Sequence, residues 1–331
     1  MKAFIRSTGS FLPETVVTNE DLAPSLGLNP DWIYRATGIR NRRWASKGTT
    51  TSSLAAKALA HALRDGAIPS ENLDYLLLGT MTPDRYVPGS ASALQIQLGL
   101  REIPCLDIRA ACCNLLYGLQ LAKALIESAT AHCVAICLAE IQSPWLRLNP
   151  DEGRTSMLFG DGASAIVLSD EDGPDSLEVL DVLLMSNGSF VDDLGIRSPG
   201  TEFGNGLGLV ETANDCAPRM MGQSVILQAT RRMTSVCQSL LQRNNLRIED
   251  IRWMVPHQAN INLVLQVARF LNFKVQDGVI SVLEEFGNTS SASMGIALDV
   301  LLRSGRIERK DLILLPAFGA GFTWGAALCR A

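Results

Sequence analysis

The chain has 331 residues, of which 47% are hydrophobic and 19% are charged, and its formal net charge is −5. This composition is typical of a well-packed globular protein, and the acidic balance gives no reason to expect nucleic acid as a partner. No uncharged apolar stretch approaches the ~20 residues that span a bilayer, and the N-terminus lacks the apolar run of a signal peptide. Eight cysteines at irregular spacing show no metal-ligand pattern and are typical of reduced thiols. We therefore predict a soluble cytoplasmic protein.

The first half of the chain predicts strands that alternate with helices. Short apolar runs between turn-forming residues are typical of buried strands, whereas alanines and leucines at helical spacing indicate helices. Ser52 or Ser53 is expected to cap the helix at 51–65, and the basic, aromatic stretch 31–44 is expected to be loop and short helix. The other predictions are strands at 3–8, 73–80 and 133–139, helices at 19–27 and 90–98, and a strand, glycine turn and strand at 155–168.

The second half repeats this order after an acidic segment with glycine and proline at 170–175. The FGDG sequence at 159–162 is echoed by FGAG at 318–321, each between an apolar run and a run of small residues. We therefore predict an α/β protein with two similar halves, residues 1–172 and residues 173–331. The elements predicted in the second half are strands at 177–185, 251–256 and 312–316, and helices at 220–242, 261–271 and 288–303.

Cys112 follows a short segment at 106–111 that is apolar enough for a strand, and it precedes a helical pattern that continues to Ile126. It is therefore expected at a strand-to-helix junction, where backbone N–H groups are unpaired and the helix dipole favours an anion. Such a site lowers the pKa of a thiol, which makes the sulfur a usable nucleophile near neutral pH. The same stretch also fits Cys112 and Cys113 as small, inert core residues, because buried free cysteine is common.

Two further residues fit a reaction at Cys112. The sequence contains only three histidines, and His61 and His132 are most simply structural. His257 follows an apolar run that opens into a loop, a usual position for a catalytic residue in an α/β protein. Asn288 lies at another loop-to-helix junction, where it also fits a simple helix cap. Cys112 can accept an acyl group, and His257 and Asn288 can stabilise an enolate, which points to decarboxylative carbon–carbon bond formation.

Six segments of the sequence resemble the β-ketoacyl-acyl-carrier-protein synthase III family. They are TGIR at 37–40, DIRAAC at 107–112, FGDGA at 159–163, VPHQAN at 255–260, GNTS at 287–290 and AFGAGFTWG at 317–325. The resemblance implies the duplicated thiolase fold, with two βαβαβαββ halves in five layers α-β-α-β-α. It also implies a homodimer that needs no metal or redox cofactor.

The resemblance assigns a role to each part of the site. Cys112 would be acylated by an acyl-CoA, and a malonyl thioester would then lose CO₂ and attack the acyl group. His257 and Asn288 would carry the decarboxylation, and the N–H groups of Cys112 and Ala320 would bind the oxyanion. An acyl carrier protein is an implied partner, although an arginine that the family uses for docking is replaced by Asn262.

Related enzymes of the same fold match less well. Thiolases need a second cysteine in the C-terminal glycine loop, and the segment 318–321 has none. Elongating synthases carry a second histidine where this chain has Asn288, and hydroxymethylglutaryl-CoA synthase needs a glutamate where this chain has Met81. The sequence itself departs from the family at Asn114, where a glycine is usual.

The resemblance places the CoA entrance at Trp32, Arg35, Arg154 and Asn260. Trp32 matches a residue that stacks on the adenine ring. The arginine that usually precedes Thr37 is replaced by Ala36, and the one that faces the adenine falls near Gly153, so that Arg35 and Arg154 are the neighbouring candidates.

The acyl pocket is placed at Val87, Arg85 and Arg147. Val87 stands where the family supplies a phenylalanine across the dimer, so this chain is expected to accept a primer longer than acetyl. Arg85 and Arg147 fit surface or interface charges, and alternatively one of them fits a partner for a carboxylate on the primer.

Three functions remain open from the sequence. The first is an initiating condensing enzyme, and the second is a divergent synthase of a specialised pathway. The second would transfer the acyl group to an oxygen or nitrogen nucleophile, or would use an unusual or dicarboxylic primer. The third is a non-catalytic acyl-CoA-binding scaffold, against which the intact Cys112, His257 and Asn288 argue.

Overall fold

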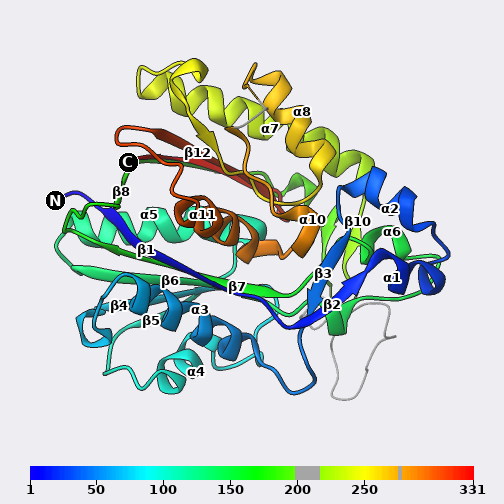
Figure 1. Ribbon diagram of the computed structural model, residues 1–331, viewed down its shortest axis with the longest axis horizontal. Coiled ribbons are helices and arrows are strands. Elements are labelled where there is room, and N and C mark those ends of the chain that lie inside the picture. Colours follow the sequence, from blue (N-terminus) through cyan, green and yellow to red (C-terminus); the bar gives the residue numbers. More distant parts are fainter. Residues whose placement is uncertain (198–216, 275–277) are drawn as a thin grey trace.

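The computed structural model describes residues 1–197, 217–274 and 278–331 and places the two halves of one long sheet between layers of helices (Figure 1). Within these ranges no helix is both long enough and apolar enough to cross a membrane.

The first half contributes five strands, whose spatial order is β1-β7-β6-β4-β5. Strands β4, β5 and β6 are parallel to one another, and β7 is antiparallel to both β6 and β1. The strands are β1 (Phe4–Phe11), β4 (Tyr75–Gly79), β5 (Cys105–Ile108), β6 (Cys133–Glu140) and β7 (Gly162–Ser169). The helices are α1 (Asn19–Leu26), α2 (Pro30–Thr37), α3 (Thr51–Asp65), α4 (Ser90–Gln97), α5 (Asn114–Glu127) and α6 (Gly153–Ser156).

The second half repeats this order as β8-β13-β12-β11, and Val279 extends it through a parallel bridge to Met254. Each strand thus has a counterpart at the same place in the first half. For example, β8 corresponds to β1, and the bridge at Val279 corresponds to β5. The strands are β8 (Leu177–Ser186), β11 (Trp253–Met254), β12 (Leu312–Gly319) and β13 (Thr323–Arg330). The helices are α7 (Gly222–Arg243), α8 (Ile261–Phe270), α10 (Leu283–Phe286) and α11 (Ser293–Arg303).

Side chains that alternate along the strands build three apolar layers. Val134, Ile136 and Leu138 of β6 face α5 and α11, whereas Cys133 and the other odd-numbered residues face α3 and α4. On β13, Trp324 and the following even-numbered residues pack against α7 and α8. Period-two alternation in which both faces are apolar is typical of a sheet covered by helices on both sides. Figure 1 shows the resulting order, with α7 and α8 on one outer face, α5 and α11 in the middle, and α3 and α4 on the other.

The two halves are joined directly by hydrogen bonds between strands. Phe4 and Ile5 of β1 pair with Glu178 and Leu177 of β8, so the nine strands form one continuous sheet. Gly9 of β1 lies so close to α3 that a Cβ there would come within 2.4 Å of the Ala58 carbonyl oxygen.

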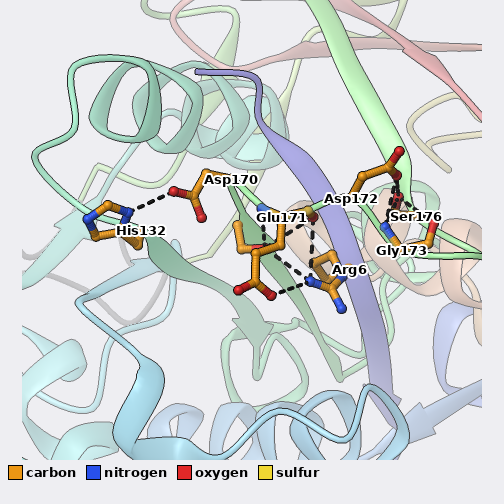
Figure 2. Close-up of polar contacts among 8 residues, drawn as sticks. Arg6, His132, Asp170, Glu171, Asp172, Gly173 and Ser176 are labelled. Atoms are coloured by element: carbon orange, nitrogen blue, oxygen red, sulfur yellow. Dashed lines mark hydrogen bonds and ion pairs between the residues drawn. The ribbon is translucent and has the colours of Figure 1, made fainter.

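The acidic segment between the halves is held by its own side chains (Figure 2). Asp170 contacts Nδ1 of His132 at 2.7 Å, and Glu171 forms an ion pair with Arg6 at 3.1 Å. The Ser176 hydroxyl donates to Asp172 at 2.6 Å. The predicted division at 172/173 therefore falls in a connection that is anchored to β1 and to the start of β6.

Most of the predicted elements are present, and the boundaries of α3 are as predicted. Its cap is Thr50 and not Ser52 or Ser53, because the Thr50 hydroxyl accepts from the Ser53 N–H and the Ser53 hydroxyl completes the capping box. The strand expected at 251–256 is limited to Trp253–Met254, although His257 N still donates to Pro316 O of β12 at 2.9 Å.

Three predicted elements are wrong. The first strand expected within 155–168 is absent, because its start belongs to α6 and Met157 and Leu158 pack in a small core with Ile33. The end of the 31–44 stretch is a strand, β3 (Asn41–Trp44), which pairs with β2 (Thr15–Thr18). The helix expected from Asn288 begins only at Ser293, after a 3₁₀ turn at Ser290–Ala292.

Candidate active site

Cys112 lies in a 3₁₀ turn, Ala111–Cys113, between β5 and α5, as the sequence predicts. The Asn114 side chain closes this turn by accepting a hydrogen bond from Ala110 N at 2.6 Å. From the second half, Gly319 at the end of β12 reaches the turn, since a Cβ on Gly319 would lie 2.9 Å from Cys112 N. Only glycine allows this approach, which brings the C-terminal glycine loop against the cysteine.

Asn288 reaches the same place through Ser290. The Ser290 hydroxyl lies 3.7 Å from the Cys112 sulfur, and Ser290 N donates to Asn288 Oδ1 at 2.8 Å. The Asn288 backbone is fixed on both sides, because its N–H donates to Leu158 O and its carbonyl accepts from Gly160 N. Since Oδ1 is already occupied, the Asn288 side-chain NH₂ is the group that remains to bind a substrate.

His257 is buried and is fixed through one ring nitrogen. Its Nδ1 lies 2.8 Å from the Ser293 hydroxyl, which also accepts from Gln258 N at 3.3 Å. In the tautomer in which the hydroxyl donates to Nδ1, the ring proton lies on Nε2. Burial lowers the pKa of His257 to about 4, which keeps the imidazole neutral near pH 7. The ring therefore offers an Nε2–H donor without a positive charge.

The expected low pKa of Cys112 is wrong for the free chain. Burial raises the pKa of the thiol to about 11, and the charge of Glu140 adds to this increase. The hydrogen bond with Ser290 acts in the opposite direction. The helix N-terminus is present as predicted, and it would lower the pKa of the thiol. The loss of hydration on burial raises the pKa by more.

The predicted oxyanion donors, the N–H groups of Cys112 and Ala320, belong to segments that lie against each other. Ala320 directly follows Gly319, which contacts the Cys112 turn. Two such donors beside one sulfur are the arrangement that stabilises the tetrahedral intermediate of acyl transfer.

Glu140, at the end of β6, is a buried carboxylate that the sequence analysis missed. Its oxygens accept from the hydroxyls of Ser291 at 2.6 Å and Thr82 at 2.9 Å, and from Met81 N at 3.1 Å. Burial nevertheless raises the pKa of Glu140 to about 7. This network ties the serine-rich loop beside Cys112 to β4 and β6 of the first half.

Replacing Glu140 with glutamine is expected to change how the free energy of unfolding depends on pH. The raised pKa means that the folded chain retains a proton between pH 4.5 and about 7 that the unfolded chain has released. The stability that this proton contributes is fully present below pH 4.5 and is lost as pH rises through 7, about 3 kcal/mol in all.

Chemical denaturation at several pH values checks this. The wild-type chain should lose about 3 kcal/mol relative to Glu140→Gln between about pH 4.5 and pH 8. Glu102→Gln, at an exposed glutamate of the same half, is the matched control and should follow the wild type. A constant difference between wild type and Glu140→Gln would contradict the assignment.

The residues predicted at the CoA entrance lie together around α2. The Arg154 guanidinium is 5.8 Å from the Trp32 ring centroid, and Arg35 is exposed. The Asn260 side chain caps α8 and donates to Ala36 O at 2.9 Å, so both of its ends are used within the chain. The contacts of Asn260 therefore favour a structural role, in which it holds α2 against α8, over a role in binding CoA.

The residues predicted at the acyl pocket differ in their exposure to solvent. Val87 is 75% exposed and Arg85 is also exposed, on the loop between β4 and α4. Arg147 is half-buried, and its Nε is a buried donor without a hydrogen-bond acceptor among the described residues. Among all the residues that the structure describes, no group of three or more His, Cys, Asp or Glu side chains could hold a metal ion.

The comparisons with known proteins cover the whole chain. A family model described as 3-Oxoacyl-[acyl-carrier-protein (ACP)] synthase III matches residues 106–188, and the model of the C-terminal part of the same enzyme matches residues 241–331. The chain is 37% identical over 326 residues to the β-ketoacyl-[acyl-carrier-protein] synthase III of Methylococcus capsulatus, covering 98% of each. The chain belongs to the β-ketoacyl-[acyl-carrier-protein] synthase III family.

Solved structures of synthase III proteins have the same fold. The enzyme of Aquifex aeolicus matches with a TM-score of 0.89 and 33% identity, over 99% of this chain and 100% of that one. The priming β-ketosynthase of the R1128 polyketide biosynthetic pathway matches with a TM-score of 0.90 and 28% identity, over 99% and 96%. The predicted family and thiolase fold are therefore confirmed. This synthase III is a condensing enzyme of the acyltransferase class.

Proposed function

We propose that this synthase III starts fatty-acid synthesis, joining an acyl-CoA primer to a malonyl thioester with loss of CO₂. The Cys112 sulfur attacks the acyl carbonyl, and the proton of the thiol leaves on the CoA sulfur. The malonyl group then loses CO₂, its carbanion attacks the acyl carbon, and Cys112 departs as a thiolate that takes up a proton. The product is a β-ketoacyl thioester, and no metal or redox cofactor takes part.

One observation carries this proposal, the link from Cys112 through Ser290 to Asn288. It brings a nucleophilic sulfur within 3.7 Å of the residue whose N–H fixes the Asn288 amide at 2.8 Å. With Oδ1 held, the amide NH₂ can donate to a thioester carbonyl, as can the Nε2–H of neutral His257. Two neutral donors stabilise an enolate that loss of CO₂ has formed, and no base is needed to remove a carbon-bound proton.

The oxyanion of each acyl step would bind the N–H groups of Cys112 and Ala320. The CoA adenine would stack at Trp32 with Arg154 beside it, where the ring and the guanidinium are already neighbours. The malonyl donor would be carried by an acyl carrier protein, in keeping with the name of the relatives.

A homodimer is supported by an unpaired sheet edge. Strand β5 is the last strand of the sheet, and Leu106 on it is exposed. Tyr86, Val87 and Ile96 add exposed apolar side chains nearby in the sequence. An exposed edge strand with apolar side chains is stabilised when another strand pairs with it, and a second copy of this chain can supply that strand. The same dimer would bring Val87 to its partner's acyl pocket. A cytoplasmic location accords with the cysteines of the described residues, all of which are free thiols.

Intact-protein mass spectrometry with a panel of acyl-CoAs, followed by malonyl-CoA or malonyl-carrier protein, tests the proposal. We expect an acyl adduct on Cys112 that is discharged with release of CO₂ and that names the primer. An adduct that ignores malonyl donors would instead favour acyl transfer to an oxygen or nitrogen nucleophile. Preference for a dicarboxylyl-CoA would point to Arg85 or Arg147 as the partner of the second carboxylate. The absence of any adduct would contradict the proposed nucleophile.

A further inference from the structure

Ser290 has a side chain that the proposed mechanism has not used. It is 4% exposed, and the only hydrogen-bond partner of its hydroxyl among the described residues is the Cys112 sulfur. Its neighbour Ser291 is also buried, but the Ser291 hydroxyl donates to Glu140 at 2.6 Å. Two adjacent serines thus point in different directions, and only the Ser290 hydroxyl faces the reacting atom.

The backbone of Ser290 holds the hydroxyl in this place. Its φ is +48°, in the left-handed region that side chains other than glycine rarely adopt. The N–H bond to Asn288 Oδ1 on one side and the Ser291–Glu140 bond on the other fix that conformation. A residue held at positive φ beside a nucleophile indicates that its position serves the site.

The chemistry of sulfur decides the direction of the bond. A thiol can donate or accept, but a thiolate has no proton and can only accept. When Cys112 is deprotonated, the Ser290 hydroxyl must therefore be the donor, and a hydrogen bond to a charged group is stronger than one to a neutral group. The Ser290 hydroxyl favours the anion more than the Cys112 backbone N–H does, whereas burial and the like charge of Glu140 disfavour it.

We propose that Ser290 is a further catalytic residue, whose hydroxyl donates a hydrogen bond to the Cys112 sulfur whenever that sulfur is negatively charged. In the proposed reaction this occurs twice, once when the thiol loses its proton to attack the primer and once when the thiolate leaves the β-ketoacyl product. The inference rests on the proposed function for these two steps, but the bond itself requires no substrate.

Alkylation by iodoacetamide tests the bond without any acyl substrate. Ser290→Gly removes the hydroxyl but keeps the N–H to Asn288 and tolerates the positive φ. Trypsin separates Cys112, in the peptide 110–123, from half-exposed Cys105, in the peptide 102–109, so Cys105 serves as a reference within the same chain. We expect Cys112 to react about tenfold more slowly in the variant at about pH 8, with its pH profile moved upward, whereas Cys105 reacts at the same rate in both.

Ser290→Ala distinguishes the effect of losing the hydroxyl from the effect of a more flexible backbone, because it also lacks the hydroxyl but keeps a Cβ. Slowing of Cys112 in both variants supports the proposal. Equal Cys112 rates in wild type and Ser290→Gly, or slowing in the glycine variant alone, would overturn it. If the wild-type enzyme forms no acyl adduct and Ser290→Gly still slows alkylation, the proposed reaction fails while the assignment of Ser290 stands.

Discussion

Replacing Cys112 with alanine is expected to abolish acyl-adduct formation and to lower the rate of condensation by about 10⁴-fold or more. The sulfur is the only group in the proposed site that can form the acyl-enzyme, so no other residue compensates for its loss. The fold should be retained, because the change removes only one sulfur atom. Intact-protein mass spectrometry measures the adduct, and release of β-ketoacyl product measures the condensation.

Cys113 supplies the matched control for this experiment. It is adjacent in sequence, but it is fully buried, and its sulfur contacts Thr323 O at 3.4 Å instead of Ser290. Burial raises its pKa well above the usual range, so the Cys113 thiol stays protonated. Cys113→Ala should therefore keep adduct formation near the wild-type level. Loss of the adduct in Cys113→Ala but not in Cys112→Ala would reverse the assignment of the nucleophile.

The parts of the fold that could be predicted are those that local chemistry decides. Helix α3 has the predicted ends because its alanine and leucine repeat is flanked by polar caps. Cys112 lies at the predicted junction because the apolar run and the helical pattern meet there. Family and fold followed from six short segments that are specific in order and spacing, and the comparisons over the whole chain confirm both.

The errors arise where tertiary contacts override the local pattern. Met157 and Leu158 are as apolar as a strand, but they pack against α1 and α2 and not in the sheet. The helix after Asn288 begins later than predicted because Ser290 adopts a positive φ, and the residue types in that segment do not indicate such a backbone.

The pKa of Cys112 was missed for a related reason. A sequence shows the helix N-terminus that favours a thiolate, but not the burial or the Glu140 charge that disfavour it. Glu140 comes from a strand 28 positions away, and its approach depends on Ser291 in the other half of the chain. The recognised motif at 287–290 includes Ser290, and the further serines at 291 and 293 in the same loop were the available signal.

In the proposed reaction, the acylation of Cys112 would depend on the groups around its sulfur. At neutral pH both the thiol and the His257 imidazole are uncharged, since burial raises the first pKa to about 11 and lowers the second to about 4. A neutral pair suits the proposed reaction, because the negative charge that enters on the malonyl carboxylate passes to a thioester oxygen as CO₂ leaves and then to the departing sulfur. In the proposed reaction the Ser290 hydroxyl would donate to the sulfur, and the Asn288 amide and the backbone N–H groups would donate to the thioester oxygens.

Changing Asn288 should separate the two halves of the reaction. In Asn288→Ala the donor to the enolate is lost while Cys112 and the proposed oxyanion donors remain. We expect acyl adducts to form within about threefold of the wild-type rate and condensation to fall by about 10²- to 10³-fold, as for the loss of one oxyanion donor. Adduct formation and CO₂ release, measured in the same samples, distinguish the two steps.

Asn288→Asp is the sharper variant, because a carboxylate keeps the acceptor for Ser290 N but cannot donate. It should therefore preserve the loop while placing a negative charge against the developing enolate, so condensation should fall at least as far as in the alanine variant. If both variants condense normally, Asn288 is not an enolate donor, and acyl transfer without decarboxylation becomes the better account. If both fail to form the adduct, Asn288 acts on the nucleophile through Ser290, because that serine is the one residue that contacts both side chains through hydrogen bonds in the described part of the chain.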